Sequence, residues 1–174
     1  MQEKNKSKEQ LIEELHTLRY KNAELSNSLK EQKNLLETLK KSENRLHLLF
    51  EFAPDAYYLN DLQGNFLEGN QAAADLLGYS KEELLGKSFL KLKILPPNQL
   101  PRAVAALAKN ALGKSTGPEE FILNRKDGNQ ISLEIRTQPV KINGEIVILG
   151  LARDISHRLQ FEKDKERISQ SSES

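Results

Sequence analysis

The chain of 174 residues contains no cysteine and no tryptophan. The absence of cysteine excludes disulfide bonds, thiolate nucleophiles, thiolate metal ligands and photochemistry that forms a cysteinyl adduct. The longest apolar run, Ile146–Ala152, is far shorter than the roughly 20 residues that a membrane-spanning helix needs. The formal net charge is only +1, so the composition gives no electrostatic reason to expect nucleic acid or a membrane as a partner. We therefore expect a cytoplasmic protein.

Glycine and proline are absent from the first 50 residues, whereas all nine glycines and all six prolines lie within residues 51–155. Because these two residues interrupt helices, the contrast predicts a helix first and a globular domain second. We place a coiled-coil helix at residues 1–45 and the globular domain at 46–156. Residues 157–174 are expected to form a short output helix and a disordered, serine-rich tail.

The N-terminal segment carries a heptad repeat, and nine of its twelve a and d positions between residues 11 and 50 are apolar. We call these twelve positions the seam. A helix roughly 60 Å long would leave such a stripe in water, which predicts a parallel homodimer. The alternative is that the helix packs on its own globular domain. The predicted dimer interface consists of Leu11, Leu15, Leu18, Asn22, Leu25, Leu29, Leu36, Leu39, Leu46 and Phe50.

Three polar residues interrupt this seam. Asn22 at an a position favours a two-stranded parallel pairing, because two such side chains can bond to each other across the seam. Gln32 and Glu43 weaken the packing between the leucine blocks, so rearrangement is expected to be easiest there. The start of the helix is marked by Ser7 and Gln10, which form a capping-box pattern.

The globular region alternates strand and turn patterns around a helical insert, which predicts an α+β fold with a five-stranded antiparallel sheet. The expected strands are 56–60, 65–68, 119–125, 130–140 and 145–153. The expected helices are 71–77, a short one capped by Ser80 and Glu83, 102–112 with Val104, Leu107, Ala108 and Ala111 on one face, and 158–168. A type I turn is expected at Asp61–Gly64. Two-residue hairpin turns are expected at Asp127-Gly128 and at Asn143-Gly144. Because residues 146–149 are all apolar, both faces of the last strand should be covered, one of them by Leu46, Leu49 and Phe50 or by a second subunit.

An ordered set of short motifs runs through this region. The set includes Pro54-Asp55-Ala56, Asp61 with Gly64, Asn70 with Ala72, Gly78-Tyr79, Glu83-Leu84 before Gly86, Arg125-Lys126-Asp127-Gly128, and Asp154-Ile155-Ser156. In these motifs the chain resembles the PAS domain family over residues 46–158. The resemblance implies a sheet whose helical side encloses a pocket for small molecules. It also implies that helices entering and leaving the domain transmit a signal, which makes Asp154 and Ile155 the expected relay into the tail helix, with Asp154 as its N-cap.

The resemblance limits the cofactors to be expected. Haem-binding PAS domains use an axial histidine in the long helix or an adjoining strand, but His16, His47 and His157 lie in flanking helical segments. Haem is therefore not expected. Covalent flavin is excluded because the chain has no cysteine to form the adduct. Non-covalent flavin stays open, although no polar set for a flavin ring is evident. No metal site and no catalytic constellation is expected.

The predicted interior has two interpretations. It is either a pocket for an apolar small molecule, with the Tyr58 hydroxyl as a polar contact, or a core filled by its own side chains. Its expected lining is Tyr58, Leu76, Leu77, Phe89, Leu95, Leu107, Phe121, Leu133 and Ile148.

Taken together, the patterns and the resemblance predict a non-enzymatic sensory module that dimerises through its N-terminal helix. Such a module would relay an input at the pocket or sheet surface to a partner signalling protein or output domain, as in a two-component system. Two alternatives remain: a ligand-free adaptor or dimerisation protein, and a sensor fragment of a longer histidine kinase or regulator.

Overall fold

The computed structural model describes residues 7–171, and the chain divides between Leu48 and Leu49 into two units. The first unit is helical. The second contains the last turn of the long helix, a sheet, and all the other helices.

The N-terminal helix α1 spans Lys8–Glu51, as the absence of glycine and proline predicts. Its capping box is confirmed: the Gln10 amide donates to Ser7 Oγ at 3.3 Å, and the Ser7 amide donates to Gln10 Oε1 at 3.0 Å. None of the residues of α1 is buried. The seam leucines remain exposed, from 46% for Leu15 to 66% for Leu36. The single chain therefore leaves the apolar stripe of α1 in contact with solvent.

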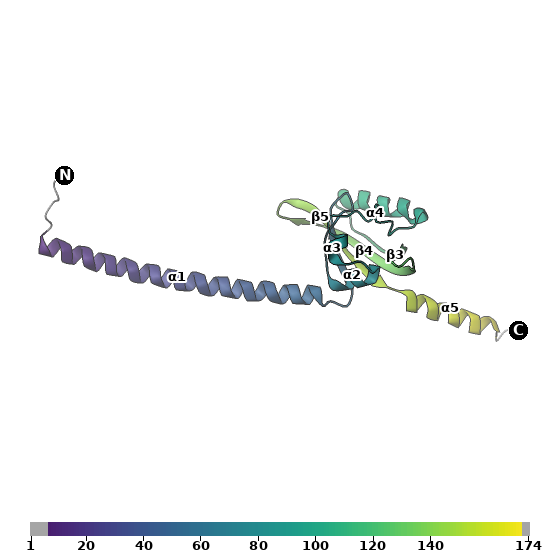
Figure 1. Ribbon diagram of the computed structural model, residues 1–174, viewed down its shortest axis with the longest axis horizontal. Coiled ribbons are helices and arrows are strands. Elements are labelled where there is room, and N and C mark those ends of the chain that lie inside the picture. The colour runs from purple at the N-terminus through teal and green to yellow at the C-terminus, as the bar shows by residue number, and fades with distance from the viewer. Residues whose placement is uncertain (1–6, 172–174) are drawn as a thin grey trace. The chain divides into compact units, whose positions relative to one another are not determined.

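The second unit is built on the predicted five-stranded antiparallel sheet, in the order β2-β1-β5-β4-β3. Figure 1 labels β3, β4 and β5 of this sheet. The strands are β1 (Ala56–Asn60), β2 (Phe66–Gly69), β3 (Thr116–Asn124), β4 (Gln130–Ile142) and β5 (Glu145–Asp154). Strands β4 and β5 extend past their predicted ends, and β3 begins and ends earlier than predicted. The α+β class and the antiparallel topology are confirmed.

Four helices of this unit follow the predicted order, with a short 3-10 turn, η1 (Pro97–Gln99), before the third of them. They are α2 (Gln71–Leu77), α3 (Lys81–Leu84), α4 (Leu100–Ala111) and α5 (Ser156–Ser171). Helix α2 is capped by Asn70 and ended by Gly78 at φ +73°, and α3 has the predicted capping box of Ser80 and Glu83. Helix α4 begins two residues earlier than predicted, since Pro101 is tolerated in a first turn. Helix α5 extends past both predicted ends, and residues 172–174 of the expected disordered tail lie outside the described residues.

The two predicted two-residue turns differ. Asn143 and Gly144 both have positive φ and directly join Ile142 to Glu145, as predicted. At Asp127-Gly128 the prediction was wrong, because only Gly128 has positive φ. There the Arg125 amide donates to the Asn129 carbonyl at 2.8 Å, which leaves a three-residue loop. A type I turn followed by a left-handed glycine explains this geometry.

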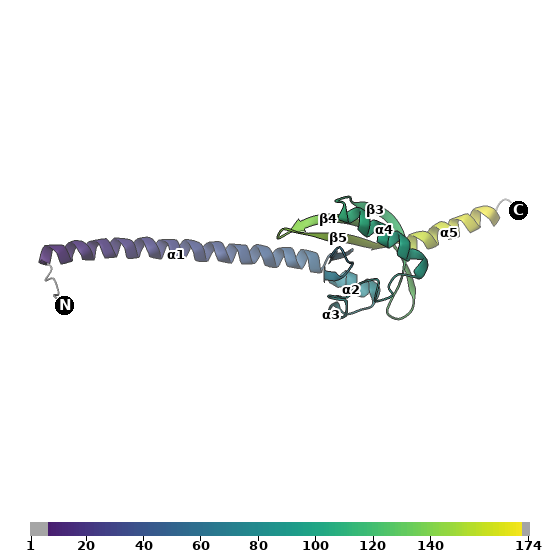
Figure 2. The ribbon, with the colours of Figure 1, turned by 90° about the horizontal axis from the view of Figure 1, so that it is seen from above.

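The core lies on one face of the sheet, which we call the inner face. Helix α2 packs on β1 and β2. Helix α4 packs on β3 and β4 (Figure 2). The buried cluster includes Ala56, Phe66, Ala73, Leu77, Leu84, Ile94, Leu95, Ala103, Phe121, Leu123, Ile131, Leu133 and Ala152.

The apolar face of α4 is mostly exposed. Val104 is 51% exposed, and Ala108 and Ala111 are exposed as well. Instead Ala103 and Asn110, seven residues apart, are the buried residues of the helix. A polar side chain, that of Asn110, is therefore buried together with Ala103, while most of the apolar face is exposed.

The opposite, outer face of the sheet is partly covered. Val147 and Ile148 point to opposite faces and both are buried, in keeping with the unbroken apolar run, whereas Ile146 near the hairpin end is 45% exposed. Phe50 in the last turn of α1 contacts Tyr57, with ring centroids 6.4 Å apart. Leu49 remains exposed, so of the residues of this unit expected to cover the outer face, only Phe50 is seen to contact it.

Candidate functional site

The predicted pocket residues converge on the inner face. Leu77, Leu95, Phe121 and Leu133 are buried in the core cluster, and Tyr58, Leu76 and Phe89 pack against it. Two predicted residues do not join that cluster. Leu107 is half-buried, and Ile148 is buried outside it.

Tyr58 of β1 is half-buried and packs against the core cluster. A Cβ atom added to Gly150 would lie closer than 3.0 Å to three atoms of the Tyr58 ring, so the ring fills the space above that glycine. The ring also packs edge-on against Phe66 at 5.9 Å, and Phe66 packs against Phe89 at 6.4 Å. Phe89 in turn lies over Gly64. A row of aromatic rings, with glycines beneath it, thus fills much of the inner face between β1, β2 and β5.

Burial raises the pKa of the Tyr58 hydroxyl to about 12, because the phenolate would lose hydration. Gly150 pairs with Tyr58 on one side and with Thr137 on the other. The ring carbon nearest to Gly150 is the one that bears the hydroxyl, so the hydroxyl is directed across β5 toward β4. Tyr58 is thereby kept as a neutral hydrogen-bonding group.

A small polar cluster lies on β4 in that direction. Asn110 is 1% exposed and donates from Nδ2 to Thr137 Oγ1 at 2.8 Å, and Thr137 Oγ1 lies 2.6 Å from Thr116 Oγ1. These groups and the Tyr58 hydroxyl are polar features of the inner face that could orient a small ligand. Sequence reasoning missed Asn110, although its spacing from Ala103 marks a helical face.

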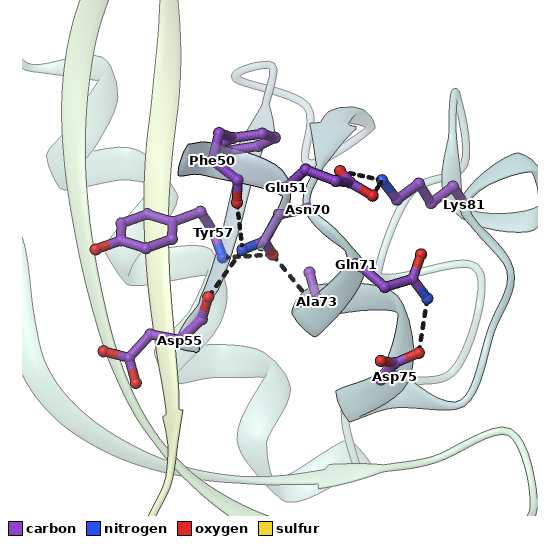
Figure 3. Close-up of polar contacts among 9 residues, drawn as sticks. All are labelled: Phe50, Glu51, Asp55, Tyr57, Asn70, Gln71, Ala73, Asp75 and Lys81. Carbon is purple, nitrogen blue, oxygen red and sulfur yellow. Dashed lines mark hydrogen bonds and ion pairs between the residues drawn. The ribbon is translucent and has the colours of Figure 1, made fainter. Parts of the chain in front are cut away.

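A second site lies where α1 joins the sheet (Figure 3). Asn70 is fully buried, and its side-chain amide uses all four hydrogen-bonding positions. Its Nδ2 donates to the Phe50 carbonyl at 3.1 Å and to the Asp55 carbonyl at 2.9 Å. Its Oδ1 accepts from the amides of Tyr57 and Ala73, each at 3.0 Å. One side chain thus joins the end of α1, the start of β1 and the start of α2.

An ion pair supports the same junction. Lys81 Nζ contacts both carboxylate oxygens of Glu51, the last residue of α1 (Figure 3). The two side chains are only 30% and 19% exposed, so the pair is partly shielded from water. It ties α3 to the end of α1.

A third contact joins the start of β1 to the end of β5. Arg153 donates to the Asp55 carboxylate from Nε at 3.0 Å and from Nη2 at 2.5 Å. The Arg153 guanidinium lowers the pKa of Asp55 below its usual value, chiefly through this hydrogen bonding. The side chain of Arg153 also lines a hollow of about 140 Å³ on the outer face, together with Glu134, Arg136 and Leu151.

The predicted relay residues lie directly after Arg153. Ser156 is the first residue of α5, and its amide donates to the Asp154 carboxylate at 2.8 Å. Asp154 is therefore one residue before the N-cap position, and the predicted N-cap assignment was wrong by one residue. Ile155 is buried, and its amide donates to the Ser132 carbonyl at 3.0 Å, while its own carbonyl accepts the Leu159 amide. Together these bonds fix the first turn of α5 to β4.

Among residues 7–171 no group of three or more His, Cys, Asp or Glu side chains could hold a metal ion. Within the same range, none of the helices has the length and apolar character needed to cross a membrane.

Comparison with known proteins identifies relatives for most of the chain. Residues 54–157, more than half of it, match the family described as PAS domain. A curated relative from Methanosarcina acetivorans, described as a methyl sulfide methyltransferase-associated sensor, is 28% identical over 163 residues. That match covers 93% of this chain, and the chain spans only 16% of the relative's length.

Two solved structures are similar as well. The PAS domain of an HTR-like protein from Haloarcula marismortui is 27% identical, with a TM-score of 0.62, over 71% of this chain and 99% of that one. A domain of a sensory box sensor histidine kinase/response regulator from Geobacter sulfurreducens is 28% identical, with a TM-score of 0.54, over 67% and 96% of the two chains.

Proposed function

Because the chain belongs to the PAS domain family, we propose that it is a non-enzymatic sensory module that dimerises in parallel through the seam of α1. Its output is a change in helix pairing that a partner signalling protein or a linked output domain detects. The similarity to a domain of a sensory box sensor histidine kinase/response regulator and to a curated sensor supports a role in two-component signalling. We expect the module to work in the cytoplasm.

The exposure of the seam is the observation that carries the dimer proposal. Eight leucines of the seam lie between 46% and 66% exposed along one helix, which is a large apolar stripe to leave in water. Pairing with a second copy would bury it, and Asn22 favours two parallel strands. Discrete packing registers of such a pair allow a small displacement at one end to select one arrangement over another.

The experiment compares charged substitutions on two faces of α1. Leu18→Glu and Leu25→Glu change the seam, whereas Tyr20→Glu changes an exposed aromatic residue outside it. Sedimentation equilibrium should give a dimer for the wild type and for Tyr20→Glu, and a monomer or much weaker dimer for the two seam variants. A wild-type monomer would refute the proposal.

The nature of the input is a separate question. The first candidate is a small molecule on the inner face, oriented by Tyr58, Asn110 and Thr137. The second candidate is a ligand-free adaptor, and the ring of Tyr58 over Gly150 favours it because the ring already takes the space above β5. Native mass spectrometry of freshly purified protein separates the two. A stoichiometric bound molecule supports ligand sensing, and a clean apo mass supports the adaptor.

A further inference from the structure

The last turn of α1 leaves backbone carbonyl groups without partners inside the helix, as every helix end does. The Phe50 carbonyl accepts from the Ala53 amide at 3.3 Å and from Asn70 Nδ2 at 3.1 Å. Because Asn70 is completely buried and all its bonds are made, it cannot follow a movement of Phe50 without losing a bond elsewhere.

One of those other bonds leads to Asp55. Asn70 Nδ2 holds the Asp55 carbonyl, while the carboxylate of the same residue is held by two nitrogen atoms of Arg153. Asp55 directly precedes Ala56, which pairs with Ala152 in the sheet. The Asp55–Arg153 ion pair therefore lies one residue beyond the last β1–β5 backbone pair. Its two hydrogen bonds from the guanidinium group fix the orientation of the two side chains.

Arg153 leads to the exit of the domain. The next residue, Asp154, accepts the amide of Ser156 at the start of α5. The amide of Ile155 is bonded to β4. A shift of Arg153 along β5 therefore reaches the first turn of α5 through the backbone alone.

We propose that Asn70, Asp55 and Arg153 form a continuous polar connection that couples the last turn of α1 to the first turn of α5. The connection lies within one protomer and depends neither on a ligand nor on dimerisation. It adds to the proposed function a route by which a change at the entering helix alters the exit helix, or the reverse. Asn70 and Asp55 act here as positioning residues, and Arg153 is the removable link between them and β5.

Hydrogen–deuterium exchange of the full chain tests this coupling at two reporter positions. The Ala53 amide reports on the end of α1, and the Leu159 amide reports on the first turn of α5, because each donates one of the bonds described above. Arg153→Gln removes the ion pair at a residue with no hydrogen bond to α1. We expect it to raise exchange about two- to five-fold at both reporters, the range for loss of a partly exposed pair.

Arg158→Gln is the matched control. Arg158 lies at the same strand–helix junction and pairs with Glu120 at 2.7 Å and Glu134 at 3.7 Å, outside the proposed connection. We expect this variant to raise exchange at Leu159 and to leave Ala53 unchanged. Exchanging the partners in the double variant Asp55→Arg, Arg153→Asp should return Ala53 toward its wild-type rate.

Two results would overturn the proposal. In one, Arg153→Gln raises exchange at Leu159 and leaves Ala53 at the wild-type rate. In the other, exchange rises equally across the domain, including the amide of buried Leu133, which would make the pair a contributor to overall stability and not a local link. Sedimentation of the same samples separates this test from that of the dimer, since coupled exchange in a monomer would support the connection and refute dimerisation.

Discussion

The hydroxyl-bearing end of the Tyr58 ring lies where a Cβ atom of residue 150 would have to be, so the position of the ring depends on Gly150 having no side chain. Gly150 has an extended backbone, not a left-handed one, and its role is therefore to leave space. The arrangement links β1 and β5 through two residues that are 92 positions apart in the sequence, and it sets the shape of the inner face.

Replacing Gly150 with alanine should destabilise the domain by about 1–3 kcal/mol, the usual cost of overpacking a filled interior. Gly69→Ala is the control, because a Cβ there would have its nearest neighbours at 3.6 Å, an ordinary contact. Urea unfolding measures both variants. Adding Tyr58→Leu to Gly150→Ala should recover part of the loss, and equal stability of the two alanine variants would show that the ring is free to move aside.

Tyr58→Phe should change how stability depends on alkaline pH. The folded pKa of about 12 lies above the unfolded value near 10, so the stabilisation is complete below about pH 10 and is lost as the pH rises toward 12. The phenylalanine variant lacks this loss. Ultraviolet titration of phenolate in the folded protein should show one of the four tyrosines ionising last in the wild type, and that late step should be absent in the variant.

Asn70→Asp keeps the shape of the side chain but removes its two donors. The Phe50 and Asp55 carbonyls would then lose their Asn70 partner, and a carboxylate would be buried, so we expect a loss on the order of 3 kcal/mol. Asn98→Asp places the same change on an exposed residue and should be close to neutral. Thermal unfolding measures the difference, and similar midpoints for the two variants would contradict the central role of Asn70.

Replacing Gln32 and Glu43 together with leucine should strengthen the proposed dimer, because both occupy seam positions between leucine blocks. We expect the melting temperature of the α1 pairing to rise by several degrees, which corresponds to a gain in unfolding free energy on the order of 1 kcal/mol or more. Switching between helix registers should diminish. Glu31→Leu with Lys41→Leu, both outside the seam, provides the control. Circular dichroism at several protein concentrations measures the effect, and a less stable seam variant would refute the prediction.

Local patterns in the sequence were sufficient for most of the fold. Composition located α1, and the caps at Ser7, Asn70 and Ser80 marked three helix starts, because a cap is satisfied by residues three positions away. Asn143-Gly144 marked a hairpin because the positive φ of a two-residue turn depends only on the two residues themselves. Asp127-Gly128 misled, since the number of residues in a loop also depends on where the flanking strands stop pairing.

The partners of residues far apart in the sequence were decided only by the tertiary structure. Apolar spacing did not reveal which face of α4 is buried, because burial of Asn110 depends on Thr137, which lies 27 residues later on another strand. Likewise, the cap motif at Asn70 predicted its bond to Ala73 but not its bonds to Phe50 and Asp55. The sequence alone determines which segments are helical, extended or turned, since these depend on neighbours along the chain. The filled space above Gly150 and the series of bonds that leads from Phe50 through Asn70 and Asp55 to Arg153 depend on side chains that only the folded sheet brings together.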